Sequence, residues 1–190
     1  MDSELERAYE LSKKAHEFWI KGRTLDALAF YEEALETFKN YQRWEETANI
    51  LEKIGDIYFF RKNYERALKA YKACLDICEN FEDEISTSII GEKIVFVYKE
   101  LNTSEKALPY LYRILEIAEK YRDAHRAGRA LVGIGDVYRA LKNYQASKEA
   151  YELALKIYRG MGALELAKIV EEGLKKLQAE IESSLPEKNV

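Results

Sequence analysis

The chain has 190 residues, of which 47% are hydrophobic and 34% charged, so it is long enough and apolar enough to bury a core. Its 30 Lys and Arg against 34 Asp and Glu leave a net charge of −4, which argues against nucleic acid or an anionic membrane as a partner. The N-terminus is polar, and no apolar run approaches the roughly 20 residues of a membrane span, so we expect a cytoplasmic protein.

Helix-favouring residues dominate the composition. Two prolines and nine glycines are few for this length, while Leu, Ala, Glu and Lys are abundant, which predicts an all-α protein. Cys74 and Cys78 lie four residues apart in an apolar-periodic segment. This spacing indicates neither a disulfide framework nor a metal site completed by histidine, so we predict reduced core cysteines, no metal and no cofactor.

The first predicted element is a helical hairpin over about residues 3–42, with a break near residues 21–23. Residues at helical spacing mark both of its helices: Leu11, Ala15, Phe18, Ala27, Tyr31, Ala34 and Leu35. Each helix is about 17 residues long with one apolar stripe, and the short link makes the two helices antiparallel.

The same pattern returns every 40 residues without insertion or deletion, which is the mark of a repeat protein. The second hairpin covers residues 43–82, and the fourth, residues 123–162, is its near copy 80 positions later. Gly55 and Gly135 take the place of Ala15 and predict close approach of two helices. Short polar residues at equivalent places are candidate N-caps: Asn63, Asp83, Thr103, Asp123 and Asn143.

The third hairpin, residues 83–122, departs from the others. Val95 and Ile114 stand where the other repeats have smaller residues, and Pro109 falls near the sixth position of its helix. A proline there removes a backbone donor, so we expect that helix to bend. A last amphipathic helix over residues 163–182 reads as a solubilising cap, which makes residues 1–182 one domain, and residues 183–190 are expected to be a flexible tail.

The ordered set Leu-x2-Ile-Gly-x2-Tyr…Tyr-x2-Ala-x3-Tyr-x3-Leu, which starts at Leu51, resembles the tetratricopeptide repeat. The period is 40 residues and not 34, as in the long-helix variety of polarity scaffolds, kinesin light chains and bacterial peptide-sensing regulators. The resemblance implies a right-handed superhelical solenoid of about nine helices. It also implies that the first helix of each hairpin lines a concave groove that binds a peptide or helix of another protein.

The groove positions that the resemblance implies are occupied by residues of both charges and by several aromatic residues: Tyr9, Lys13, His16, Trp19, Glu52, Lys53, Asp56, Phe59, Phe60, Lys93, Phe96, Lys99, Arg129, Gly133, Asp136 and Arg139. Basic and acidic residues are nearly balanced, which favours an amphipathic partner without strong charge. The family members that bind a chaperone C-terminus need Lys and Asn at set positions. Here Lys93 is the only basic match, which argues against that ligand.

Trp19, Phe59, Phe60 and Phe96 would align on three successive first helices as an apolar anchor for a partner. The alternative is that Ile20 and Phe60, near their helix ends, pack on the next hairpin. Gly133 has two interpretations as well, because a glycine there could admit a ligand backbone or serve helix packing. Most tyrosines fall on the repeat grid and are expected in the core, and neither His16 nor His125 has a nucleophile or phosphate-loop pattern nearby.

The sequence therefore predicts a protein-interaction module, an adaptor, scaffold or sensor, that is not an enzyme and has no catalytic residues. A first alternative is a self-assembling structural protein that forms homo-oligomers through its end helices or groove. A second is a regulator that acts on the phosphoaspartate of a response regulator, as some proteins with similar repeats do. That activity uses side chains on added helices, which this chain does not have.

Overall fold

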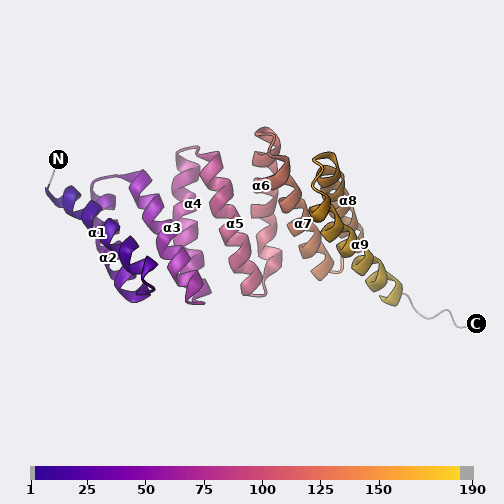
Figure 1. The fold of residues 1–190 in the computed structure, drawn as a ribbon, viewed down its shortest axis with the longest axis horizontal. Helices are drawn as coiled ribbons and strands as arrows, with labels where there is room; N and C mark the ends of the chain where they lie inside the picture. The colour runs from indigo at the N-terminus through magenta and orange to yellow at the C-terminus, as the bar shows by residue number, and fades with distance from the viewer. Residues whose placement is uncertain (1–2, 185–190) are drawn as a thin grey trace, which may run out of the picture. The chain divides into compact units, whose positions relative to one another are not determined.

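The computed structural model describes residues 3–184, and in that range the chain is helical with no strand (Figure 1). The helices in chain order are α1 (Ser3–Ile20), α2 (Thr24–Asn40), α3 (Trp44–Phe60), α4 (Tyr64–Asn80), α5 (Glu84–Glu100), a 3-10 helix η1 (Ser104–Ala107), α6 (Leu108–Lys120), α7 (Ala124–Ala140), α8 (Tyr144–Gly160) and α9 (Leu164–Ser184). The prediction of an all-α repeat protein built from helical hairpins is confirmed.

A three-residue turn follows each of the long helices before the last, and its middle residue has a positive φ. Glycine supplies this conformation at Gly22 (φ 73°) and Gly162 (φ 72°), and other residues at Gln42, Lys62, Glu82, Asn102, Arg122 and Lys142. In the first turn the Arg23 N–H donates to the Phe18 carbonyl (2.9 Å) and the Gly22 N–H to that of Trp19 (2.9 Å). This Schellman pattern ends the helix and reverses the chain, so neighbouring helices of a hairpin are antiparallel.

Four of the five predicted N-caps are confirmed. The side-chain oxygens of Asn63, Asp83, Asp123 and Asn143 each accept a hydrogen bond from the backbone N–H three residues later. The prediction for Thr103 is wrong, because its side chain makes no capping bond and a 3-10 helix, η1, follows it.

The expectation that Pro109 bends the interior of a helix is also wrong. The chain passes through η1 first, and α6 begins only at Leu108, so Pro109 lies in the first turn of a helix of 13 residues. The first turn has no intrahelical partner for its N–H groups, and proline costs little there. The third hairpin thus accommodates its proline by starting the second helix late.

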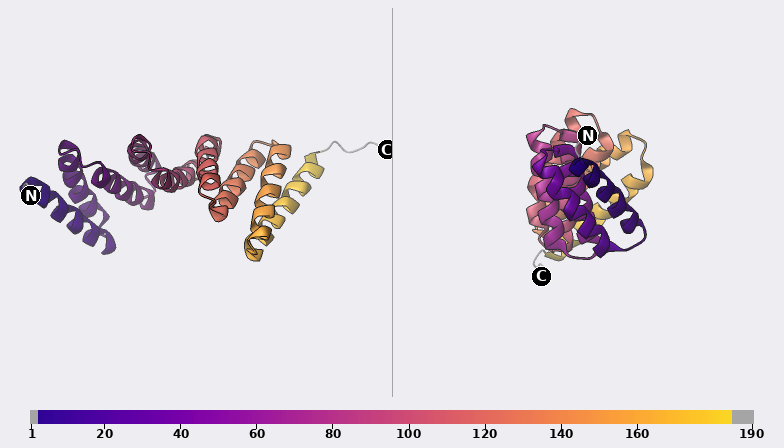
Figure 2. Two further views of the ribbon diagram at one scale, coloured as in Figure 1. Left: turned by 90° about the horizontal axis from the view of Figure 1, so that it is seen from above. Right: turned by 90° about the vertical axis from the view of Figure 1, so that its left-hand side faces the viewer.

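The helices form two compact units, with the division between Leu101 and Asn102. Unit 1 contains α1 to α5, and its core includes Tyr31, Phe38, Ile54 and Ile57. Unit 2 contains η1 and α6 to α9, and its largest buried cluster includes Tyr151 and Tyr158. Figure 1 and Figure 2 show that successive helices within each unit lie side by side.

Glycine and tyrosine are paired in the two most similar hairpins. A Cβ built on Gly55 would come within 2.6 Å of the ring atom Cδ1 of Tyr71, and one on Gly135 within 2.7 Å of Cδ1 of Tyr151. Each ring therefore fills the space that a side chain on the glycine would need. Tyr71, Tyr151 and the other grid tyrosines Tyr31 and Tyr98 are buried, as the repeat predicted.

Helix α9 buries Ala167, Val170 and Leu177 against unit 2, on the face that the sequence predicted. It extends through Ser184, two residues beyond the predicted end, so residues 183–184 do not belong to a tail, and residues 185–190 lie outside the described residues. Across residues 3–184, no helix combines the length and apolar character that a bilayer crossing requires.

Candidate functional site

The first helices of unit 1, α1, α3 and α5, carry most of the predicted groove residues. Midway along α3 and α5 is a set of charged side chains that we call the central ion cluster: Glu52, Asp56 and Lys93. The Lys93 ammonium lies 2.8 Å from Glu52 Oε1 and 2.5 Å from Asp56 Oδ1. Lys53 also reaches Glu52 at 3.6 Å. Side chains that the sequence placed in a binding groove are therefore bonded to one another between α3 and α5.

Partial burial strengthens the central ion cluster. Burial alone would raise the pKa of Glu52, but the hydrogen bond and charge of Lys93 hold it below its usual value. Burial would likewise lower the pKa of Lys93, yet its bonds to Asp56 and Glu52 raise it. The Tyr71 hydroxyl donates to Asp56 (2.7 Å), and burial and this bond raise the pKa of Tyr71. Lys93 is thus ionised and already paired in the free protein.

Towards the C-terminal ends of the same helices lies an apolar strip, which we define as Ile20, Phe60 and Phe96 with the half-buried Trp19. Ile20 is 71% exposed, Phe60 69% and Phe96 59%, so the alternative that Ile20 and Phe60 are covered by the next hairpin is wrong. Trp19 packs edge-on against Phe60 with ring centroids 5.4 Å apart. The strip joins α1 to α3 through this contact.

The central ion cluster also sets the level of Phe96. Phe60 lies one turn beyond Asp56 on α3, and Phe96 lies nearly one turn beyond Lys93 on α5. Because Asp56 and Lys93 are in contact, the two phenylalanines follow the cluster at the same end of their helices. Phe59, the fourth predicted member, is half-buried and packs edge-on against Tyr64 at 5.5 Å.

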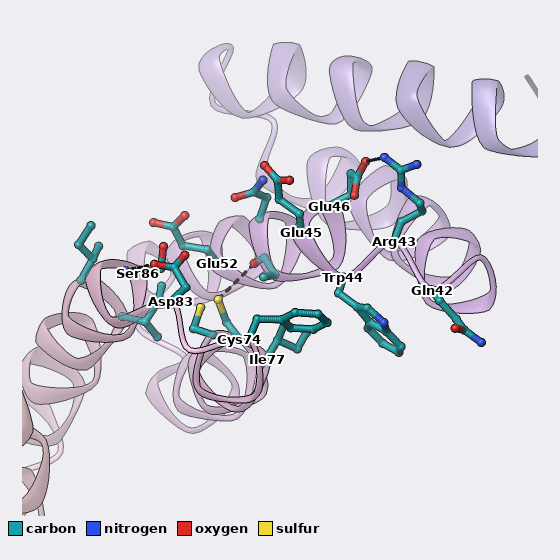
Figure 3. Close-up of a pocket in the computed structure, with 16 residues that line it drawn as sticks. Gln42, Arg43, Trp44, Glu45, Glu46, Glu52, Cys74, Ile77, Asp83 and Ser86 are labelled. Atoms are coloured by element: carbon teal, nitrogen blue, oxygen red, sulfur yellow. Dashed lines mark hydrogen bonds and ion pairs between the residues drawn. The ribbon is translucent and has the colours of Figure 1, made fainter.

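Towards the N-terminal ends of α3 and α5 the structure has a cleft of about 690 Å³, shown in Figure 3. Its walls are the first half of α3 and the first two turns of α5, and the last turns of α4 close it. Apolar side chains among its lining residues are Trp44, Ala48, Ile77, Phe81, Ile89 and Ile90, together with the buried cysteines Cys74 and Cys78. The Cys74 thiol donates to the Ala48 carbonyl (3.3 Å), and both cysteines are free core thiols as predicted.

One rim of the cleft contains a network of Tyr9, Arg43 and Glu46. The Glu46 carboxylate accepts hydrogen bonds from the Arg43 guanidinium and from the Tyr9 hydroxyl, and Arg43 also donates to Tyr9 (3.0 Å). The hydrogen bond from Arg43 is the main reason why the pKa of Glu46 falls to about 2. The predicted groove residue Tyr9 therefore fixes α1 to the start of α3.

The remaining predicted residues of unit 1 do not converge on one site. Lys13 and His16 are exposed on α1, and Lys99 is exposed near the end of α5. Lys13 lines a separate shallow hollow with Arg7, Glu10 and Phe30, at the side of α1 that meets α2.

In unit 2 the predicted groove residues have mainly structural contacts. Asp136 accepts a hydrogen bond from the Tyr151 hydroxyl, and Arg139 donates from Nε to both carboxylate oxygens of Glu180 on α9 at 3.0 Å. A Cβ on Gly133 would lie 2.7 Å from Leu111, so the helix-packing interpretation of this glycine holds. Arg129 is exposed on α7.

Sequence reasoning missed the residues that form the cleft at its α4 side. Trp44 is the first residue of α3 and Phe81 follows the last residue of α4, so both lie at breaks in the apolar periodicity and were not counted as groove residues. A signal was present, since two large aromatic residues flank the turns of one hairpin. Among the described residues no group of three or more His, Cys, Asp or Glu side chains could hold a metal ion.

Comparisons with known proteins agree with the geometry. The family model described as tetratricopeptide repeat matches residues 7–80 and 89–160. The apo form of RapI superposes with a TM-score of 0.78 at 19% identity, over 93% of this chain and 64% of that one.

Two further solved structures have the same fold. They are a signal transduction ATPase (STAND protein) with a tetratricopeptide repeat sensor from Pyrococcus horikoshii (TM-score 0.72, 23% identity, 93% of this chain and 27% of that one) and aspartyl phosphate phosphatase F from Bacillus subtilis (0.68, 15%, 96% and 51%). The chain spans less than two thirds of each of the three proteins, and identities this low show the fold alone. No protein of curated function matches the chain in sequence.

Proposed function

The chain belongs to the tetratricopeptide repeat family, and on that basis we propose that it is a protein-interaction module that holds an amphipathic segment of a partner on the first helices of unit 1. The family relation supports interaction with another polypeptide as the role. The residues that would carry it come from the geometry of unit 1.

The observation that carries the proposal is the exposure of the apolar strip. Large apolar side chains at the ends of three successive first helices remain in water, although the repeat could bury them or replace them with polar residues. Aromatic side chains of this kind dominate the binding energy of protein interfaces. A partner segment that lies across α1, α3 and α5 would remove Ile20, Phe60 and Phe96 from water together.

The central ion cluster favours an apolar anchor over a strongly charged one. Lys93, the one residue that matched the clamp for a C-terminal carboxylate, is held by Glu52 and Asp56. A ligand carboxylate would have to displace one of these bonds and leave a half-buried carboxylate without its cation. The strip next to the cluster offers apolar contact without this cost.

The substitution Phe60→Glu tests the proposal, because it places a charge in the centre of the strip at a residue that is exposed. Wild-type protein and variant would each be immobilised and used to capture partners from the source organism. We expect at least a tenfold loss of the captured partner, which is about 1.4 kcal/mol. Ile169→Glu is the matched control, since Ile169 is 62% exposed on α9 of unit 2.

Two results would overturn the proposal. One is equal capture by wild type and Phe60→Glu. The other is equal loss in Phe60→Glu and Ile169→Glu, since that would indicate general hydrophobic adhesion. Light scattering of the purified chain covers self-assembly: if Phe60→Glu dissociates an oligomer that Ile169→Glu preserves, the strip binds a second copy of the chain and the partner proposal fails.

A further inference from the structure

The cleft in unit 1 has the size of a binding site and is separate from the apolar strip. Its volume of about 690 Å³ lies in the range of ligand sites, roughly 300–1,000 Å³. The central ion cluster lies between the two surfaces, because Glu52 is at the inner end of the cleft while Asp56 and Lys93 come before the strip. The cleft can therefore bind its own part of a partner.

One side of the cleft is apolar. Trp44 and Ile77 point to the same side of α3 in Figure 3, and Cys74 lies behind them. Phe81 is 60% exposed and Trp44 39%, although both line a concave surface. An apolar side chain of a ligand would contact these rings and the half-buried Ile77.

The other side carries negative charge. Four carboxylates line the cleft, Glu45, Glu46, Glu52 and Asp83, against the single cation Arg43. Arg43 bonds to Glu46, and Lys93 bonds to Glu52, which leaves Glu45 and Asp83 as the carboxylates without a bonded cation from either residue. Asp83 caps α5 through a neutral backbone N–H (3.0 Å) and keeps its charge.

We propose that this cleft binds a short partner segment that inserts an apolar side chain against Trp44, Ile77 and Phe81 and places a flanking Lys or Arg at Glu45 and Asp83. The proposal rests on the proposed function, because it takes the occupant to be part of another protein. It adds the chemistry of that part: a cationic amphipathic segment. Apolar contact supplies affinity, and charge complementarity selects a basic over an acidic sequence.

Unit 2 shows how the repeat looks when the cleft is absent. Residues 80 positions later take the places of its lining, and Tyr158 stands where unit 1 has Cys78. The buried Tyr158 ring occupies the space beside Gly128, where a Cβ would lie 2.6 Å from the ring, and Gly128 replaces Ala48. His125, Arg126, Val132 and Ala163 take the places of the four carboxylates. The space and the charge of the cleft therefore occur together in unit 1.

The probe for the test is a fluorescein-labelled helical peptide of Leu, Trp, Ala and Lys, titrated into the full chain and followed by anisotropy. Two matched peptides carry Glu for every Lys, or Ser for every Leu and Trp. We expect saturable binding of the first peptide alone. Equal binding of the Glu peptide, or of the peptide without apolar residues, would overturn the proposal.

Charge variants show whether binding occurs at the cleft. Glu45→Gln with Asp83→Asn removes both charges, and asparagine preserves the cap of α5. Asp123→Asn with Glu165→Gln makes the same change in net charge at equivalent repeat positions of unit 2. We expect about fivefold weaker binding of the Lys peptide in the first double variant and less than about twofold in the second. An equal loss in both would mean non-specific attraction to an acidic protein.

A steric variant tests the apolar side with a solution that the chain already uses. Ala48→Gly with Cys78→Tyr transfers the pair from unit 2 and should close the cleft, so peptide binding should be lost while the helical circular dichroism remains. Full binding by this folded variant would overturn the proposal. If the variant does not fold, Phe81→Ser decides, with Tyr121→Ser as its exposed equivalent in unit 2.

The two cysteines provide a readout confined to the cleft, because they are the only ones in the chain and both line it. Bound Lys peptide should slow their reaction with a disulfide reagent in wild type, and an unchanged rate at saturation would contradict binding there. Phe60→Glu distinguishes the two proposals. If Phe60→Glu loses partner capture while no peptide protects the cysteines, the strip proposal stands and the cleft proposal fails.

Discussion

The hairpin of α3 and α4 with α5 and the hairpin of α7 and α8 with α9 use one repeat grid and have opposite surface chemistry. Unit 1 leaves Phe60 exposed on its first helix, whereas the equivalent residue of unit 2 is Ala140. Phe59 corresponds to Arg139, which bonds to Glu180 on α9. The difference teaches that the grid fixes the fold through its buried positions and leaves the first-helix face free to vary.

The two regions also bond to their neighbouring first helix in different ways. In unit 1, α3 and α5 meet through Lys93 and two carboxylates, and open surfaces remain on either side. In unit 2, α7 and α9 meet through Arg139 and Glu180, and Tyr158 fills the space that corresponds to the cleft. We therefore assign recognition to unit 1 and regard α9 as the closing helix of unit 2.

The largest expected effect tests the buried part of the comparison, where the two regions are alike. Gly55→Ala and Gly135→Ala each push a Cβ into a tyrosine ring whose hydroxyl is held by Asp56 or Asp136, so the ring cannot move away freely. Overpacking costs about 1–3 kcal/mol and exceeds the roughly 1 kcal/mol that alanine gains over glycine in a helix. We expect the free energy of unfolding to fall by up to about 2 kcal/mol, and more at Gly55, where the ring is closer.

Tryptophan fluorescence and circular dichroism separate the two units in this experiment, because Trp19 and Trp44 are the only tryptophans and both lie in unit 1. Gly55→Ala should shift the fluorescence transition. Gly160→Ala is the control, since a Cβ there meets no atom within 4 Å. If Gly55→Ala is as stable as Gly160→Ala, the account of the paired glycine and tyrosine is wrong.

The sequence was sufficient for the fold because a strict period repeats each signal. Positions of Gly, Ala and Tyr that recur at 40 or 80 residues locate the helices and turns even where one copy is weak. The late start of α6 was beyond it. Pro109 excludes an ordinary helix interior, but the sequence does not state whether the helix bends or begins later, since this depends on whether η1 can pack.

The site was less predictable, because exposure depends on neighbours and not on periodicity alone. Phe59 and Phe60 are adjacent and differ by about 100° around α3, so the repeat could not determine which one faces water. The charge of the groove was also misjudged from composition. Lys93 and Arg139 were counted as available to a ligand, yet both are bonded to carboxylates of the next first helix.

A second prediction tests the different connections between first helices. Lys93→Met leaves Glu52 and Asp56 half-buried without their cation, and we expect unit 1 to lose about 1–2 kcal/mol of stability. Arg139→Met should cost less, because Glu180 is more exposed and water can replace the guanidinium. Denaturant titration of both variants gives the ranking. A greater loss in Arg139→Met would show that the connection in unit 2 is the more important one.

The smallest expected effect concerns acid stability and Glu46, whose equivalent in unit 2 is Arg126. The folded pKa of Glu46 is about 2, below its ordinary value of 4.5, mainly because Arg43 donates a hydrogen bond to its carboxylate. A depressed folded pKa adds stability that is fully present above pH 4.5 and is lost as the pH falls from 4.5 to about 2. Because the Arg43 side chain is exposed and water screens the pair, we expect a contribution below about 1 kcal/mol. Glu46→Gln should lower the stability seen by tryptophan fluorescence at neutral pH and converge with wild type near pH 2, while Glu45→Gln, one residue away and exposed, should follow wild type at every pH. A constant difference between Glu46→Gln and wild type across this range would mean that Glu46 stabilises unit 1 by packing and not by its charge.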